Sequence, residues 1–395
     1  MCTDKPLFYL TSFIIAVGIV FALSLPVFTV LYYDFSPYHF FIRQLGVGLV
    51  GILIMWSLSQ LDPDRVIVGR LTTFEVIGFC LFFGSFLLIM VMQLLPASLV
   101  PLTGGAKRWI RLGPLSLSPV EFFKVGFVFF LAWSFNRKIS RDKKKLKEEF
   151  WLLLPYFLVL AVATFFILVL QKDLGQVVVL AVTLMVLGTF AGTSKRFFAI
   201  LSGVGVLLLI AAIITQPHRI RRFQSWWVTN QDAILKILPS EWAEQLYITG
   251  AEEPYQITHS LNAIYHGGFF GTGLGGGTFK LGFLSEVHTD FVLAGIAEEI
   301  GFIGLIGVSS ILLFIIFRIL KISSRSFNNN VYHLFSLGIA VIITVAFLMN
   351  AYGITSLIPI KGIAVPFLSY GGSSVLALSI AVGMVLMVSK KVDLS

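Results

Sequence analysis

Long apolar runs, separated by short polar segments, recur from one end of this chain to the other. A helix that crosses a bilayer needs about 20 mostly apolar residues, because each residue rises about 1.5 Å. On that rule the pattern predicts ten membrane-spanning helices, at residues 8–32, 41–60, 73–95, 119–135, 151–169, 176–192, 197–215, 290–317, 331–356 and 366–388. The expected fold is an all-α integral membrane protein, built as a single polytopic domain over residues 1–395.

One polar connection, residues 216–289, is far longer than a link between two helices requires. It separates the seventh predicted span from the eighth. Within it, RRFQSWWV (Arg221 to Val228) mixes basic and aromatic residues, as segments at the membrane interface do. Residues 231–248 alternate apolar and polar positions around Pro239, which predicts two short surface helices. A long connection with such content is typically functional.

The distribution of Lys and Arg predicts the orientation of the spans. If the N-terminus is cytoplasmic, the segments on that side hold 17 of these residues, and the short segments on the other side hold 5. Cytoplasmic loops of membrane proteins carry such an excess. Both termini are therefore expected in the cytoplasm, with residues 216–289 as one long extracellular loop. The basic segment 136–150 favours a topology determinant on anionic lipid, with partner binding as the alternative.

Composition agrees with a membrane protein and excludes several other classes. The chain is 57% hydrophobic and 12% charged, whereas a soluble domain carries roughly 25% charged residues. The net charge of +9 is explained by topology, so no nucleic-acid partner is expected. Of the two cysteines, Cys2 and Cys80, the second lies inside a predicted span, which excludes a disulfide framework and a cysteine metal site.

The candidate chemistry is concentrated between Tyr255 and Gly304. Eight glycines lie from Gly267 to Gly282, so the backbone there can turn sharply and approach a ligand closely. Three of these glycines match G-x-G-x-x-G, but no strand precedes them and no βαβ unit surrounds them, which excludes a dinucleotide site.

Acidic residues follow the glycines. Glu286, His288 and Asp290 form an acid–imidazole–acid cluster, and Glu298 and Glu299 stand inside the next apolar run. Carboxylates in such a run are costly, so they are functional candidates by default. The spacing of the cluster is not that of a specific zinc site. A divalent cation held between these oxygens and a substrate diphosphate is an open alternative.

Asp290 is the candidate general base. It stands at the N-terminal edge of the eighth predicted span, where the helix dipole favours its ionised form. Burial and the neighbouring Glu286 would raise its pKa, and a carboxylate between these influences can accept a proton. The alternative is a helix N-cap, because Thr289 and Asp290 are both good capping residues. The residues alone leave the two roles equally open.

A second group of candidates lies in GGAKRWIRLGPLSLSPVEFFK, before and within the fourth predicted span. Lys107 and Arg108 lie on the outer side, against the topology bias, which favours a bound anion such as a phosphate. Trp109 would anchor at the interface or stack on a sugar. Glu121 and Lys124 lie one turn apart, and a structural ion pair and a substrate role are equally open.

Two further stretches carry candidate residues. Gln171 to Gly175 (QKDLG) is typical of a short turn that caps a helix at Asp173. Residues 350–374 (NAYGITSLIPIKGIAVPFLSYGGSS) interrupt two apolar runs around Lys361 and add the hydroxyl of Ser369. Such breaks are tolerated where backbone lines a cavity, so a cavity wall is favoured over a re-entrant structural turn.

Together these motifs resemble the SEDS family (shape, elongation, division and sporulation). The resemblance covers essentially the whole chain and rests on GGAKRWIRLGPLSLSPVEFFK, QKDLG, GTGLGGGTFKLGFLSEVHTDFVLAGIAEEIGFIG and KGIAVPFLSYGGSS, in that order. PIKG is similar to the division branch of the family more than to the elongation branch. The chain departs from the family at Lys172, where a proline is usual.

The resemblance implies a ten-span peptidoglycan glycosyltransferase of the bacterial inner membrane. It would polymerise lipid II at the division septum, together with a class B penicillin-binding protein transpeptidase and other division membrane proteins. The family's essential aspartate falls on Asp290, its arginine–tryptophan element on Arg108 and Trp109, and its PxKG lysine on Lys361. We expect catalysis by Asp290 and substrate binding by Lys107, Arg108, Trp109, Glu121, Lys124, His288, Lys361 and Ser369.

Several alternatives stay open at this point. Mg²⁺ or Mn²⁺ would assist the leaving group, although the sequence shows no dedicated metal cage. The elongation paralogue would run the same reaction. A lipid II flippase would use the same polar cavity but needs alternating access, and the sequence shows no convincing internal repeat. A non-enzymatic division scaffold would tolerate loss of the outer cations.

Overall fold

The computed structural model describes residues 3–103, 105–113, 115–138, 146–192, 195–214, 216–248, 255–284, 286–359 and 362–394. The helices, in chain order, are α1 (Lys5–Ser24), α2 (Val27–Tyr32), α3 (His39–Gln60), α4 (Thr73–Phe79), α5 (Ser85–Val91), α6 (Pro119–Lys138), α7 (Leu146–Thr164), α8 (Leu174–Ala191), α9 (Lys195–Ile214), α10 (Pro217–Leu235), α11 (Ser240–Leu246), α12 (Tyr255–Gly267), α13 (Val292–Arg325), α14 (Asn330–Ile354) and α15 (Gly372–Ser389). Three short helical segments of other pitch complete them: η1 (Cys80–Gly84), η2 (Phe165–Leu170) and η3 (Phe279–Leu281).

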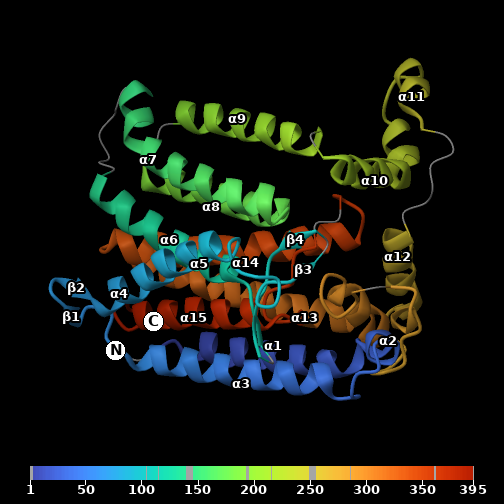
Figure 1. Cartoon of the computed structure of the whole chain (residues 1–395), viewed down its shortest axis with the longest axis horizontal. Coiled ribbons are helices and arrows are strands. Elements are labelled where there is room, and N and C mark those ends of the chain that lie inside the picture. The colour runs from blue at the N-terminus through green and yellow to red at the C-terminus, as the bar shows by residue number, and fades with distance from the viewer. Residues whose placement is uncertain are drawn as a thin grey trace.

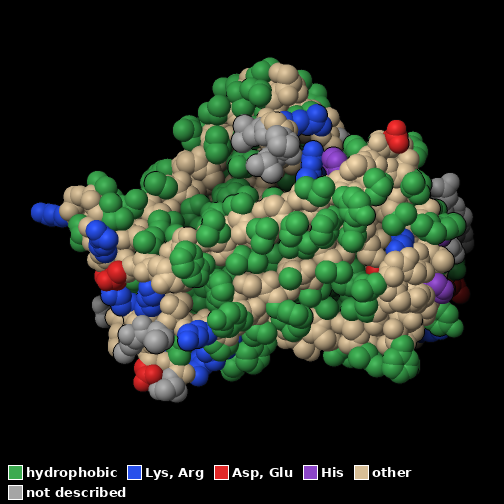
Figure 2. Space-filling model, turned by 90° about the horizontal axis from the view of Figure 1, so that it is seen from below, with side chains coloured by type: hydrophobic (Ala, Val, Ile, Leu, Met, Phe, Trp, Pro, Cys, Tyr) green, Lys and Arg blue, Asp and Glu red, His purple; other side chains and the backbone are tan. Residues whose placement is uncertain are grey.

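Most of these helices run side by side along the long axis of the molecule (Figure 1). Both chain termini lie at one end of this bundle, on the left of the figure, and α10, α11 and α12 lie at the opposite end. Hydrophobic side chains cover the middle of the face in Figure 2, while Lys and Arg gather at its left end. The surface is therefore that of a helical bundle with an apolar middle and polar ends, as a bilayer requires.

Within the described residues, seven helical stretches are long and apolar enough to cross a membrane, namely Lys5–Ser24, His39–Gln60, Thr73–Val91, Leu174–Ala191, Val292–Arg325, Asn330–Ile354 and Gly372–Ser389. The other three predicted ranges also hold helices, which are α6, α7 with η2, and α9. The chain is a multi-pass membrane protein. The share of buried residues reaches 78% in α15 and 67% in α14 but only 28% in α3, so α14 and α15 form the centre of the bundle.

The first and last predicted spans need correction. The run 8–32 is two helices, since α1 ends at Ser24 and α2 begins after Pro26. Proline has no N–H to donate and clashes with the preceding turn, which ends the first helix. The last helix begins at Gly372 rather than at residue 366, because Pro366 and the residues after it form turns.

The all-α expectation also missed three small hairpins. β1 (Val66–Val68) pairs with β2 (Leu71–Thr72), β3 (Leu102–Thr103) with β4 (Ala106–Lys107), and β5 (Ile110–Leu112) with β6 (Leu115–Leu117), all antiparallel. Each strand has only two or three residues, which is too short for an alternating pattern to show in the sequence. The last two hairpins carry Arg108 and Trp109 between them.

The long connection between α9 and α13 is mostly helical in its described residues. The basic and aromatic segment lies inside α10, which continues to Leu235, and α11 starts at Ser240, directly after Pro239. Two helices therefore flank Pro239 as predicted, but the first is a long one. Figure 1 shows α11 and α12 lying across the direction of the spans.

The glycine-rich loop completes the hydrogen bonds of a break in α13. Gly301 has φ 71° and ψ −175°, which interrupts the helix. The carbonyls of Glu298 and Glu299 accept instead from the N–H groups of Thr272 (3.0 Å) and Gly273 (2.9 Å). The N–H groups of residues 302 and 303 donate to the carbonyls of residues 268 and 269 (2.9 and 3.2 Å). The glycines thus allow a close approach to the backbone of α13, whereas the sequence led us to expect a close approach to a ligand.

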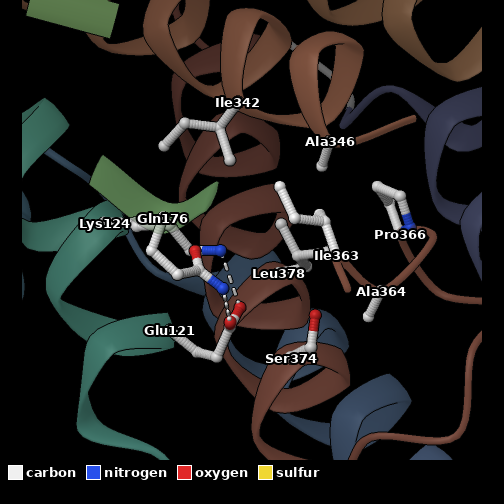
Figure 3. Close-up of a pocket in the computed structure, with 10 residues that line it drawn as sticks. All are labelled: Glu121, Lys124, Gln176, Ile342, Ala346, Ile363, Ala364, Pro366, Ser374 and Leu378. Atoms are coloured by element: carbon white, nitrogen blue, oxygen red, sulfur yellow. Dashed lines mark hydrogen bonds and ion pairs between the residues drawn. The ribbon is translucent and has the colours of Figure 1, made fainter. Parts of the chain in front are cut away.

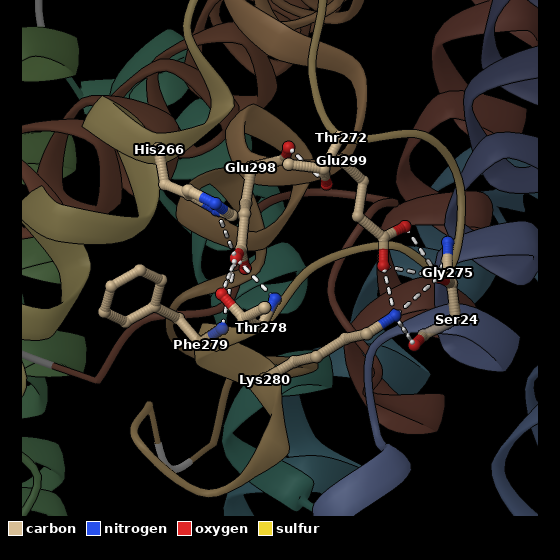
Figure 4. A network of polar contacts seen from close by, with 9 residues as sticks. All are labelled: Ser24, His266, Thr272, Gly275, Thr278, Phe279, Lys280, Glu298 and Glu299. Atoms are coloured by element: carbon tan, nitrogen blue, oxygen red, sulfur yellow. Dashed lines mark hydrogen bonds and ion pairs between the residues drawn. The ribbon is translucent and has the colours of Figure 1, made fainter.

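The side chains of Glu298 and Glu299 anchor the same loop (Figure 4). Each residue is 1% exposed. Glu298 Oε1 accepts from the N–H groups of Thr278 (2.6 Å) and Phe279 (3.0 Å), and lies 3.1 Å from Nδ1 of His266. A buried carboxylate needs such partners, so Glu298 is an anchor of the loop, where the sequence suggested a functional candidate.

Glu299 is the second anchor. Its carboxylate accepts from Lys280 Nζ (2.6 Å) and from the hydroxyl of Ser24 in α1 (2.6 Å). Lys280 is as deeply buried as Glu299, so each charge neutralises the other in the interior. The contact joins the glycine-rich loop and the start of α13 to the end of α1.

Replacing Glu299 with Gln should destabilise the protein by about 3–5 kcal/mol, because it leaves the ammonium of Lys280 buried without a counter-charge. Thermal unfolding in lipid nanodiscs measures this loss. Lys391→Ala is the control, since it removes exposed ion pairs with Asp62 and Asp64 worth about 1 kcal/mol or less. Equal losses in the two variants would contradict the structural role of the buried pair.

Candidate functional site

Asp290 lies in the turn that leads into α13. Its N–H donates to the carbonyl of Glu286 (3.1 Å), and Glu286 has φ 57°. The N-cap of α13 is Phe291, and no side chain bonds the first N–H groups of the helix. Thr289 donates instead to the carboxylate of Glu286 (2.9 Å). The N-cap interpretation of Asp290 is therefore wrong, and its carboxylate is not used to cap α13.

Asn350 and Gly362 hold Asp290 from the side. The Nδ2 of Asn350, in α14, donates to the carbonyls of Asp290 (2.7 Å) and Ile363 (2.8 Å). Gly362 has φ +60°, and a β-carbon there would lie 2.9 Å from Asp290 Oδ2. Only glycine combines this backbone conformation with this approach. Residues 362 and 363 thus form a wall beside the carboxylate.

Ser369 and His288, both expected to bind substrate, fix the same turn. The hydroxyl of Ser369 donates to the carbonyl of Thr289 (2.6 Å), and the N–H of Tyr370 donates to the carbonyl of His288 (2.8 Å). The imidazole of His288 packs edge-on against Phe40, with centroids 4.8 Å apart. Burial lowers the pKa of His288, so the ring is neutral at pH 7. These two residues position the turn of Asp290.

The charge of Asp290 is under opposing influences. The residue is half-buried, and burial raises the pKa of its carboxyl to about 6, with repulsion from Glu286 and Asp173 adding to the effect. Arg222 and Arg108 attract the carboxylate and oppose that rise. At neutral pH the group is ionised, yet it is a stronger base than an ordinary aspartate.

Arg108 lies on the opposite wall, held by backbone carbonyls. Its Nε donates to the carbonyl of Gln171 (2.6 Å) and its Nη2 to that of Lys172 (3.2 Å). Lys172 has φ 54°, which the ring of a proline forbids. The Lys172 departure from the family therefore changes the shape of this turn. Asp173 caps α8 through the N–H of Gln176 (3.3 Å), as the sequence suggested.

The neighbours of Arg108 are placed differently. Lys107 Nζ donates to the carbonyls of Gln93 (2.9 Å) and Leu95 (2.6 Å), so it ties the β3–β4 hairpin to the residues after α5. Lys107 was expected to bind substrate, and these hydrogen bonds to backbone carbonyls were not predicted. Trp109 is half-buried between β4 and β5. Lys361 lies outside the described residues.

Glu121 and Lys124 form an ion pair at the start of α6, with Nζ and Oε2 2.9 Å apart. Gln176 of α8 donates to the other oxygen of Glu121 (2.9 Å). The three side chains line a small pocket together with Ile363, Ala364 and Pro366, with room for about one water molecule (Figure 3). This segment directly follows Gly362, so the ion pair lies against the chain that continues the wall beside Asp290.

The described residues do not form a metal cage. Among them, no group of three His, Cys, Asp or Glu side chains is placed to hold an ion. In the acid–imidazole–acid cluster, the Glu286 carboxylate accepts from Thr289, and the ring of His288 lies against Phe40. These side chains therefore do not converge on a common point with Asp290.

Sequence reasoning missed Asn350 and Arg222. Asn350 is an isolated polar side chain near the end of an apolar span, and this isolation could have marked it as a functional candidate. Arg222 was seen only as part of an interfacial segment. Its relation to Asp290 depends on a contact between α10 and distant parts of the chain, which the sequence pattern does not contain.

Comparison with known proteins identifies the family. The family model described as "Cell cycle protein" (FTSW_RODA_SPOVE) matches residues 4–394. The chain belongs to this FtsW/RodA/SpoVE family. The expected SEDS resemblance is thus confirmed over the whole chain.

Several members are similar along their full length. The chain is 45% identical to the probable peptidoglycan glycosyltransferase FtsW of Helicobacter pylori, with 99% of each chain covered. The chain is 33% identical to the protein of the same name in Coxiella burnetii, with 90% of this chain and 88% of the relative covered. It is 31% identical to the one in Escherichia coli O6:H1, with 97% of this chain and 85% of the relative covered. These names agree with the division branch expected from PIKG.

Solved structures show the same fold. A chain from the structure described as "Structural coordination of polymerization and crosslinking by a peptidoglycan synthase complex" superposes with a TM-score of 0.71, at 22% identity, covering 99% of this chain and 98% of that one. The rod shape determining protein RodA of Thermus thermophilus gives 0.63 at 22% identity, with the same coverage. The FtsW/RodA/SpoVE fold therefore applies to this chain.

Replacing Asp290 with Asn should stabilise the protein by about 1–2 kcal/mol at about pH 8, allowing for its partial exposure. The pKa of Asp290 is higher in the fold than in the unfolded chain, so its ionisation costs stability as the pH rises through about 6. Thermal unfolding at about pH 8 and about pH 5 should show a gain roughly half as large at the lower pH, because at about pH 5 the folded carboxyl is protonated while the carboxyl of the unfolded chain is still ionised.

Glu286→Gln is the matched control for this stability measurement. Glu286 is exposed, so neutralising it should raise the melting temperature at about pH 8 by much less than Asp290→Asn does, through the repulsion of Asp290 that it removes. A loss of stability in the Asp290 variant at about pH 8 would indicate a structural partner for the carboxylate instead.

Proposed function

We propose that this chain is a peptidoglycan glycosyltransferase that polymerises lipid II during septal cell-wall synthesis. The observation that carries the proposal is Asp290, a half-buried carboxylate with its pKa raised to about 6, in a site flanked by Arg108. The 45% identity to FtsW of Helicobacter pylori, over 99% of both chains, supports the reaction class. The family's role as a cell cycle protein supports the place in division.

The proposed topology has ten spans with both termini in the cytoplasm. Two observations support it: the termini lie at the same end of the bundle, and Lys and Arg gather there. Asp290 and the long connection between α9 and α13 then lie at the outer face of the bacterial cytoplasmic membrane. The apolar sides of the helices would accommodate the polyprenyl chain of the substrate.

In the proposed reaction, Asp290 accepts the proton of the acceptor sugar hydroxyl of lipid II. That oxygen attacks the anomeric carbon of the growing strand, the bond to the diphosphate breaks, and undecaprenyl diphosphate leaves with inversion at the carbon. A base with a pKa of about 6 is ionised at pH 7 and still takes the proton effectively. Arg108 stabilises the negative charge that develops on the leaving group.

The other expected residues fall into two groups. Ser369, His288, Glu121 and Lys124 hold the walls of the site, and Lys107 is used by backbone carbonyls. Lys361 and Trp109 stay candidates for binding substrate. Because the described side chains form no cage for an ion, a Mg²⁺ or Mn²⁺ would arrive on the substrate diphosphate, and no step above depends on it.

The proposed partner is a class B penicillin-binding protein transpeptidase at the division septum, together with other division membrane proteins. Likeness to a chain of a structure that describes coordination of polymerization and crosslinking by a peptidoglycan synthase complex supports an assembly of this kind. The elongation paralogue would share the site, and the FtsW names of the full-length relatives favour division.

Asp290→Asn should abolish polymerisation of lipid II, because no other described carboxylate takes its place between Gly362 and the arginines. We would reconstitute the purified chain with its cognate transpeptidase, block other glycosyltransferases, and compare glycan strands. Equal amounts of glycan strands from a folded variant and from the wild type would contradict the assignment of Asp290 as the general base. No strands from either, with lipid II translocation intact in vesicles, would instead support the flippase.

The rate should depend on pH through Asp290. Its conjugate base is the active form, so kcat/KM should fall below a pH of about 6 and level off above it. Lipid II polymerisation measured from about pH 5 to about pH 8 tests this. Glu286→Gln should lower the midpoint, because it removes a negative charge that raises the pKa of Asp290. An unchanged profile in that variant would contradict the assigned base.

A further inference from the structure

Helix α10 is anchored on both sides of the site by side chains of one face. Arg219 donates from Nη1 to the carbonyl of Ala212 (2.7 Å) and from Nη2 to that of Leu168 in η2 (3.1 Å). Trp226 Nε1 donates to the carbonyl of Ser356, beyond α14 (2.8 Å). One anchor thus reaches the segment before Gln171, and the other reaches the segment before Gly362.

A third contact strengthens the second anchor. Asn230 Nδ2 donates to the carbonyl of Ser356 (3.0 Å) and approaches its hydroxyl (2.9 Å). Positions 219, 226 and 230 follow the spacing of one helix face, at about 100° per residue. Arg222 belongs to the same face, three residues after Arg219. Its position therefore lies on the anchored face of α10, between Arg219 and Trp226.

The two anchored segments precede, in the chain, the walls already described. Residues 171 and 172 hold Arg108 through their carbonyls, and Gly362 lies against the carboxylate of Asp290. Arg222 lies on the helix face that is anchored to both segments, and its charge acts on Asp290 together with that of Arg108. Two guanidinium groups from distant parts of the chain thus act on one carboxylate.

Arg222 forms no ion pair with another described residue. It is exposed, and no carboxylate or carbonyl oxygen in the described part of the chain accepts a hydrogen bond from it. The charge of Arg222 is therefore available to a ligand beside Asp290.

We propose that Arg222 is a substrate-binding residue that, together with Arg108, holds the diphosphate of the lipid-linked substrate next to Asp290. A guanidinium binds phosphate oxygens through paired, charge-assisted hydrogen bonds, which suits two arginines on opposite sides of a diphosphate. The inference rests on the proposed function for the identity of the diphosphate. The anchors of α10 fix the position of the arginine before substrate arrives.

Arg222→Gln should raise KM for lipid II by about tenfold or more, with kcat changed much less, because a charge-assisted contact to the substrate is lost. Arg222→Lys should recover part of the loss, since it restores the charge without the fork of donors. Arg221→Gln is the matched control: it removes the same charge from the adjacent position, which points about 100° away on the helix. Equal effects at the two positions would overturn the inference.

A binding measurement separates this inference from the proposed function. Undecaprenyl diphosphate, but not undecaprenol, should raise the melting temperature of the wild type and of Arg221→Gln in nanodiscs, and the rise should be lost in Arg222→Gln. If the wild type makes no strands but keeps this pattern, the reaction is wrong and the diphosphate site stands. An equal rise in all three proteins would overturn the site, even where strand synthesis proceeds.

Discussion

The end of the bundle opposite the chain termini depends on the interruption of α13 at Gly301. In a membrane-embedded bundle, an unpaired backbone group costs several kcal/mol, so the carbonyls and N–H groups released by the break must find partners. The glycine-rich loop supplies them from residues 268–273. Glu298 and Glu299 then bind the same loop through their side chains, and Glu299 extends the contact to Ser24 of α1. Loop and helix thus form one rigid unit.

This unit sets the position of Asp290. The residue lies two positions before the start of α13, the helix that the loop repairs. Asn350, Ser369 and Gly362 hold it from α14 and from the connection to α15. Burial is the main cause of the raised pKa of its carboxyl. The same packing that orders this end of the bundle makes Asp290 a stronger base.

The sequence predicts the helices well because hydropathy reports burial in lipid directly, and all ten apolar ranges contain a helix. It does not predict the break in the first span, which a single residue, Pro26, causes. It also does not predict the hairpins, because their strands are very short. The contacts of Glu298 and Lys107 could not be predicted for a different reason. Their partners, Thr278 and the carbonyls near Leu95, are brought to them by the tertiary structure. The sequence shows that burying a charged side chain costs free energy, but it does not show which groups compensate for that cost.

The arginines around Asp290 follow a common physical logic. Arg108 is held by the neutral carbonyls of residues 171 and 172, and α10 is held through Arg219 by carbonyls as well. Carbonyl dipoles fix an arginine without cancelling its charge, whereas a carboxylate partner would do both. The turn that presents these carbonyls has Lys172 at φ 54°, which proline cannot adopt. A change of one residue in that turn therefore reaches the site by re-aiming the oxygens that place Arg108.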